Sequence, residues 1–448
     1  MTRTPDPVTR GLWFGLVAAM SLIPFFTIPL GFWTGVPKGI GWTGNFAIPV
    51  AFFFALAIRG NSKVLFDLRE RLLMWFVLLF TAYAIIGLGF GPNNLLVSLA
   101  SITGAIGGYG AGLGAYTLAR KGDKPLEHLW RWSIIGMIPL VTLPFLVQAM
   151  LDTQTEREWM LRLYGFSNVR SLGHYSTVAV TILIGLSALV LGDIATHRKR
   201  QRVGWHFAGL ALMWSILFWS GSRGGIMAIG VGIPLACLVL GRLRLWEVAY
   251  NTAAAIAGAV LSLAYVIPHS AYGLFDRLTH SAGKLAEGAG ASLAEEVGNG
   301  RGEVWAWTLE RIAERPWFGW SFLPMSGIDI ETRPKVAHAH NVILDYLVGY
   351  GIPVACLVFA VVGVLWVRAL LAARSNPTPS SITAAYLITM LPAYSMVSAV
   401  LIAPYQLILF GICIGALIGG DIRRKMRPNP KEKDKPEGRE IPDETVFL

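Results

Sequence analysis

The chain has 448 residues, of which 54% are hydrophobic and only 15% are charged, and its formal net charge is +11. A soluble domain has about 25% charged residues, so this composition excludes an ordinary soluble protein. In a membrane protein, such a charge is typical of loops held in the cytoplasm, and we expect no nucleic-acid partner.

Many apolar runs reach the roughly 17–25 residues that a helix needs to cross a bilayer. Their continuity excludes a membrane barrel, whose strands alternate over about 10 residues. The sequence therefore predicts an all-α polytopic membrane protein with twelve transmembrane helices. We expect these spans at residues 11–30, 42–58, 72–90, 94–118, 133–151, 173–192, 205–220, 225–240, 247–267, 345–368, 382–398 and 402–420.

The distribution of basic residues predicts the orientation. Twelve spans put both termini on one side, and most of the 38 Lys and Arg residues fall in segments on that side, which is therefore cytoplasmic. The first apolar stretch has no convincing small-residue cleavage site, so we expect it to remain as a span. The expected regions are nine spans (1–267), a large outer loop (268–341), three spans (342–420) and a disordered basic tail (421–448).

The large outer loop contains one expected helix. In "GEVWAWTLERIAERPWFGW", apolar residues recur at a spacing of three to four, and Pro316 ends the pattern. Arg301 lies just before it in "VGNGRGEVW", where the flanking glycines predict a turn. We interpret Arg301 as a phosphate-binding residue near a helix N-terminus. The alternative is an ordinary surface arginine.

Arg223 lies in "FWSGSRGGIMAIG", in the shortest outer turn between two spans. An arginine at this depth costs a few kcal/mol unless it faces a cavity or a partner. Ser222 is expected to cap the following helix. An arginine beside a helix N-terminus is suited to binding an oxyanion or a phosphate. The alternative is an arginine that extends to the lipid head groups.

His338, His340 and Asn341 lie together in "KVAHAHNVILDY", where the tenth span begins. A histidine is neutral near pH 7 and can accept a proton from a sugar hydroxyl as a general base. The alternatives are a helix cap by Asn341, histidines at the membrane interface, and a metal site. We expect no metal, because His338 and His340 do not share a helix face and no carboxylate or thiol cluster completes a ligand set. His174, which begins the sixth span, is expected to line the same cavity.

Three of these stretches together resemble the O-antigen ligase/polymerase family, most of all the ligases. They are "GSRGG", "GR" followed by "ERPWFGW", and "AHN", within residues 221–351. In this resemblance "HN" followed by Gly351 matches His340 to the family histidine. Val354 departs from the pattern, because ligases usually have Gly, Thr or Tyr there.

The resemblance implies a C-type glycosyltransferase fold in the bacterial inner membrane, with the active site facing the periplasm. Such an enzyme transfers a glycan from undecaprenyl diphosphate to a sugar hydroxyl of lipid A–core, with inversion, and needs neither metal nor nucleotide nor another cofactor. In this interpretation Arg223 and Arg301 bind the diphosphate. His340 is the base, and Asn341 or Asp345 orients it.

Other functions remain open from the sequence. An O-antigen polymerase or a protein O-oligosaccharyltransferase uses the same donor with a different acceptor. A polysaccharide transporter also suits twelve spans. However, the sequence has no Walker motif, and the span interiors hold few charges, which disfavours proton-coupled transport.

Overall fold

The computed structural model describes residues 108, 110–120, 125–150, 169–191, 197–264, 301–320, 339–398, 400–402 and 404–426. Regular structure in these residues is helical throughout. The expected spans at 11–30, 42–58 and 72–90 lie outside them, and so do most of the outer loop, His338 and the tail beyond residue 426.

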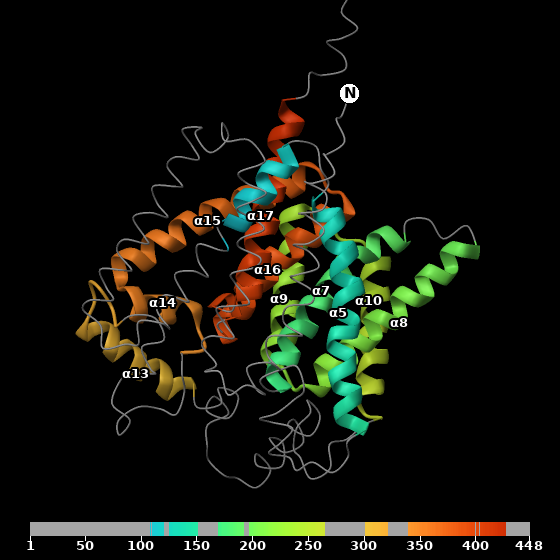
Figure 1. Ribbon diagram of the computed structural model, residues 1–448, viewed down its shortest axis with the longest axis horizontal. Coiled ribbons are helices and arrows are strands. Elements are labelled where there is room, and N and C mark those ends of the chain that lie inside the picture. Colours follow the sequence, from blue (N-terminus) through green and yellow to red (C-terminus); the bar gives the residue numbers. More distant parts are fainter. Residues whose placement is uncertain are drawn as a thin grey trace, which may run out of the picture.

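The helices follow one another along the chain as in Figure 1. They are α5 (Pro125–Met150), α7 (Val169–Leu191), α8 (His197–Trp219), α9 (Arg223–Leu240), α10 (Leu245–Ser262), α13 (Arg301–Glu314), α14 (Val342–Tyr350), α15 (Ile352–Ser375), α16 (Pro379–Ser398), the short 3-10 helix η3 (Val400–Ile402) and α17 (Pro404–Lys425).

Among the described residues, five helices are long and apolar enough to cross a membrane. They are Leu172–Leu191, Arg223–Leu240, Ile352–Ser375, Pro379–Ser398 and Gln406–Lys425. Each overlaps an expected span, and α5, α8 and α10 are helical where three further spans are expected. The expected all-helical architecture with several membrane spans is therefore confirmed for this part of the chain. The total of twelve spans stays a prediction.

Helix α16 lies at the centre of the bundle, packed against α7, α9, α15 and α17 (Figure 1). Small residues bring it close to its neighbours. A Cβ atom added to Gly232 of α9 would lie 2.6 Å from the Cα atom of Met390, and one added to Gly185 of α7 would lie 2.6 Å from that of Thr383. Lipid tails are as apolar as leucine, so membrane helices associate by such close packing.

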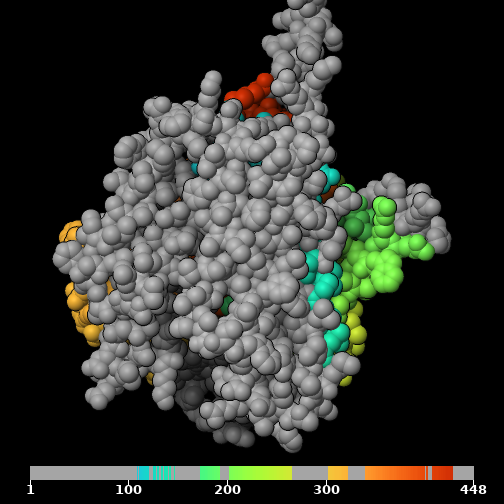
Figure 2. All heavy atoms as spheres, in the orientation of Figure 1, coloured from blue at the N-terminus to red at the C-terminus, as the bar shows by residue number. Residues whose placement is uncertain are grey.

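Helices α13 and α14 lie side by side at one edge of the molecule, and α8 lies at the opposite edge (Figures 1 and 2). The structure here differs from the single span expected at 345–368. The helix is interrupted at Gly351, which has φ 80° and separates α14 from α15.

The break at Gly351 has a tertiary cause. The segment after α13 docks against it: the Ile352 amide donates to the Pro316 carbonyl at 2.7 Å, and the Trp320 amide donates to the Val348 carbonyl at 2.7 Å. Any Cβ on Gly351 would overlap the Trp317 backbone. The "RPWFGW" segment and Gly351 thus pack directly against each other.

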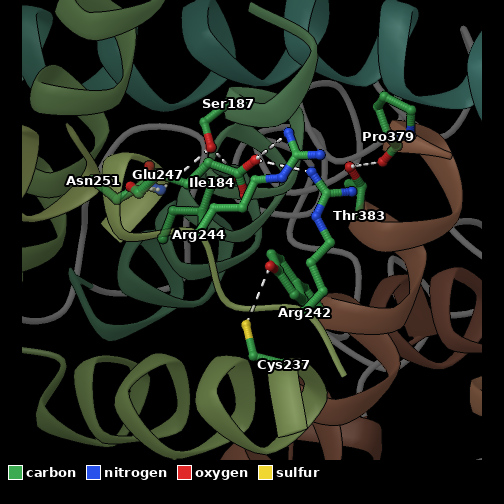
Figure 3. Close-up of polar contacts among 10 residues, drawn as sticks. Ile184, Ser187, Cys237, Arg242, Arg244, Glu247, Asn251, Pro379 and Thr383 are labelled. Carbon is green, nitrogen blue, oxygen red and sulfur yellow. Dashed lines mark hydrogen bonds and ion pairs between the residues drawn. The ribbon is translucent and has the colours of Figure 1, made fainter. Parts of the chain in front are cut away.

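A polar cluster lies at the C-terminus of α9, where the sequence reads "GRLR". Gly241 adopts a left-handed conformation and ends the helix. Arg242 and Arg244 both turn towards Glu247, at 2.9 Å and 3.6 Å (Figure 3). Because one carboxylate pairs with both guanidinium groups, we assign this cluster to holding the connection between α9 and α10.

Packing of α9 on α16 is testable through Gly232. We expect Gly232→Ala to lower the thermal unfolding midpoint in detergent, because its methyl group meets the Met390 backbone; overpacking of this kind costs about 1–3 kcal/mol. Gly363→Ala on α15 is the control, since an added Cβ there meets no atom within 4 Å. Equal midpoints for the two variants would contradict the close contact.

Candidate functional site

His340 has an unusual backbone. Its φ is 55°, and it is the only non-glycine residue with a positive φ in the described part of the chain. A left-handed conformation costs a non-glycine residue roughly 1–2 kcal/mol, so it persists only where surrounding contacts determine it. The imidazole is partly exposed, so the residue is both constrained and accessible.

The contacts that constrain His340 act on the preceding residue, Ala339, which is fully buried. The Trp305 indole Nε1 donates to the Ala339 carbonyl at 2.8 Å. The Ala339 amide donates to Asp345 Oδ1 at 2.7 Å. Ala339 is therefore clamped from both sides, and Trp305 connects α13 directly to the segment that carries His340.

Asn341 is the N-cap of α14. Its Oδ1 accepts hydrogen bonds from the amides of Ile343 at 2.9 Å and Leu344 at 3.3 Å. Such a cap stabilises a helix by about 1 kcal/mol. The helix-cap interpretation of Asn341 is therefore confirmed, and these two hydrogen bonds orient the backbone that follows His340.

Asp345 is a buried carboxyl group one turn into α14, outside the candidate membrane spans. Its Oδ2 atom is buried and has no hydrogen-bond partner in the structure. Burial raises the pKa of this group from 3.8 to about 7, although the bonds to the backbone at Ala339 and Asn341 act in the opposite direction. The group thus titrates close to neutrality beside the His340 segment.

Arg223 is the first residue of α9 and is partly exposed. Ser222 occupies the N-cap position, but its side chain makes no capping bond, contrary to expectation. Its Oγ atom instead lies 2.7 Å from the Tyr394 hydroxyl of α16. The tertiary partner competes successfully with the first-turn amides of α9 because α9 and α16 pack closely.

Tyr394, which contacts Ser222, also contacts His174 of α7. The two rings meet edge to face with centroids 5.3 Å apart, and His174 Nε2 lies 3.2 Å from the Ser398 hydroxyl. The sequence interpretation missed Tyr394. Its only signal was the group of hydroxyl residues, Tyr394, Ser395 and Ser398, at the end of an otherwise apolar span.

Arg301 is the first residue of α13, rather than part of a turn before it. Arg301 lies one helical turn before Trp305, the residue that holds Ala339 beside His340. Trp305 thus connects the "GRGEVW" segment to the "AHN" segment, and Tyr394 connects α16 to the "GSRGG" segment through Ser222.

Two further basic residues, at the end of α13 and directly after it, have local partners. Arg311 pairs with Glu314 at 2.8 Å, and Arg315 lies over the Trp320 ring at 4.1 Å from its centroid. No group of three or more potential ligands that could hold a metal exists among the described residues. Metal independence stays a prediction.

Asp345 makes stability depend on pH. Because the pKa of its carboxyl group is higher in the folded protein, its stabilising effect is full below about pH 4 and is lost as the pH rises through 7. We expect Asp345→Asn, which keeps an acceptor for the Ala339 amide, to remove this loss. The gain in unfolding midpoint over wild type should therefore grow from acidic to alkaline pH.

Glu310→Gln is the control for this measurement, because Glu310 is an exposed carboxyl group on α13. Its unfolding midpoint should follow that of wild type across the same pH range. A pH-independent difference between Asp345→Asn and wild type would contradict the raised pKa of the Asp345 carboxyl group.

The middle of the chain is similar to a known protein family. Residues 208–359 match the family model described as O-antigen ligase, a family of membrane enzymes of polysaccharide and lipopolysaccharide assembly. The matched region contains Arg223, Arg301, His340 and Gly351, whereas His174 and Tyr394 lie outside it. The chain matches no curated protein.

Proposed function

Because residues 208–359 match the family model described as O-antigen ligase, we propose that this protein is an O-antigen ligase. It transfers a glycan from undecaprenyl diphosphate to a sugar hydroxyl of lipid A–core, at the periplasmic side of the bacterial inner membrane. The observation that supports the proposal is the Trp305 hydrogen bond, which joins α13, the helix that begins with Arg301, to the segment that carries His340.

The two arginines suit a diphosphate leaving group. Each is the first residue of a helix, and helix N-termini favour anions through their free amides and dipole. The Ser222 side chain is bound to Tyr394, so it does not cap the amides of the first turn of α9. Fixed positive charges that face the departing diphosphate stabilise the transition state.

His340 suits the role of general base. Its neutral imidazole takes the proton of the acceptor hydroxyl while the oxygen forms a bond to the anomeric carbon of the donor sugar. The bond from that carbon to the diphosphate oxygen breaks, and the electron pair leaves with the diphosphate. Attack from the face opposite the leaving group inverts the anomeric configuration. The clamp on Ala339 supplies the fixed geometry that such attack requires.

Donor activation in this scheme needs no metal, because the guanidinium groups supply the positive charge at the diphosphate. A chelator should therefore leave the transfer rate unchanged in purified protein. A metal requirement would count against the assignment of Arg223 and Arg301.

An O-antigen polymerase or a protein O-oligosaccharyltransferase would use the same donor site with another acceptor. Val354, where the chain departs from the ligase pattern, is buried at the start of α15. A deletion strain separates these functions: loss of a ligase leaves lipid-linked polymer that is not attached to core, whereas loss of a polymerase leaves single repeat units on the core. A transporter would leave transfer intact in broken membranes.

The base assignment is tested at the histidines. His340→Ala should lower the transfer rate in membranes by about 10²–10⁴-fold, the usual contribution of general base catalysis. His338→Ala, the neighbouring control, should have a milder effect at equal expression. Wild-type activity of the His340 variant would exclude it as the base.

The diphosphate assignment is tested at the arginines. Arg223→Lys and Arg301→Lys keep the charge but lose the forked pair of donors, so each should reduce transfer by about 10–10³-fold. Arg244→Lys, at the opposite end of α9, is the matched control and should transfer normally. The model fails if both site variants show the wild-type rate.

A further inference from the structure

Helix α9 presents a row of exposed apolar side chains beginning one turn after Arg223. Met227, Val231, Leu235 and Leu238 are between 41% and 77% exposed. Their spacing of three to four residues places them on the same helix face as Arg223. The residue assigned to the diphosphate therefore stands at one end of a continuous apolar stripe.

The other membrane helices at the site are more enclosed. Three candidate spans carry its polar residues: α7 with His174, α9 with Arg223 and α16 with Tyr394. Only 33% of the α9 span is buried inside the protein, against 61% for α7 and 72% for α16. Among these three helices, α9 thus gives a lipid-borne molecule the most open approach to the site.

Gly230 and Pro234 lower the surface along the flank of this stripe that lies on the Arg223 side, because successive helix residues are about 100° apart. Both are exposed, and an added Cβ at Gly230 would meet no atom within 4 Å. The side chains of Met227, Val231 and Leu235 stand along one side of this low section. A row of this kind accommodates a chain with methyl branches better than a straight acyl chain, because branches enter the gaps between side chains.

We propose that the polyprenyl chain of the donor lies along this outward face of α9, with its diphosphate at Arg223. The proposal rests on the proposed function. Arg223 and Leu238 are 15 residues apart, or about 22 Å, which is a large part of the roughly 30 Å hydrocarbon core. Since lipid competes for the same apolar surface, the stripe acts through shape and orients the chain.

Gly230→Leu tests the proposal, because the new side chain would fill the low section and its Cβ atom would meet no protein atom within 4 Å. Gly230 lies about 10 Å along the helix from Arg223. We would measure transfer by the purified full chain in nanodiscs with two donors, glycans on undecaprenyl diphosphate and on dimethylallyl diphosphate. The variant should raise KM for the undecaprenyl donor about tenfold, as for a misfit in an apolar site. The five-carbon donor, which ends before Gly230, should react as with wild type.

Gly363→Leu is the matched control on α15, the other exposed span, where an added Cβ also meets no atom within 4 Å. It should show wild-type KM for both donors. A raised KM only in the Gly363 variant would place the chain on α15, and unchanged values in both would place it in bulk lipid; either result overturns the proposal. If wild type transfers from neither donor, the proposed function itself fails.

A second measurement on wild type does not depend on the folding of a variant. An undecaprenyl diphosphate with a photoreactive group in its third isoprene unit should crosslink within Met227–Leu235, identified by mass spectrometry. Crosslinks confined to α15 or to lipid would overturn the assignment to α9.

Discussion

The arrangement of the candidate site depends on one buried peptide. Ala339 is held by the Trp305 indole on its carbonyl side and by the Asp345 carboxylate on its amide side. Because the peptide cannot rotate, the next residue, His340, is kept in a left-handed conformation that it would otherwise leave. The same Trp305 belongs to α13, which begins with Arg301, so one clamp connects the His340 segment to the helix that carries Arg301.

A second constraint comes from the bilayer. Membrane helices gain little from burying apolar surface, so their positions depend on close packing and a few polar contacts. Tyr394 on α16 is such a contact, because it joins Ser222 of α9 and His174 of α7. At the other end of α9, Cys237 and Tyr386 contact each other at 3.3 Å and lie near the Arg242–Glu247 pair. The two ends of α9 are thus held by similar contacts, but only the end at Arg223 is a helix N-terminus, whose dipole favours an anion.

Local signals predicted much of this structure. The apolar runs predicted the helices, and Asn341 was correctly considered as a cap because its side chain acts within three residues of itself. Long-range effects were missed. Ser222 has the right chemistry for a cap, but Tyr394, 172 residues away, takes its hydroxyl. The interruption at Gly351 was not predicted either, because apolar residues flank this glycine in the sequence. It depends on the Pro316 carbonyl, which accepts a hydrogen bond from the Ile352 amide.

By itself the sequence determined the class of the protein, the positions of its apolar helices and the residue types available for chemistry, because composition and helical periodicity are local properties. Through its motifs it also pointed to the family that residues 208–359 match. Only the tertiary structure decided that Tyr394 pairs with Ser222, the residue before Arg223, that Trp305 holds the peptide before His340, and that α9 presents an exposed apolar stripe. These depend on which side chains meet across helices, and in a membrane that is set by shape and by polar pairing between distant segments.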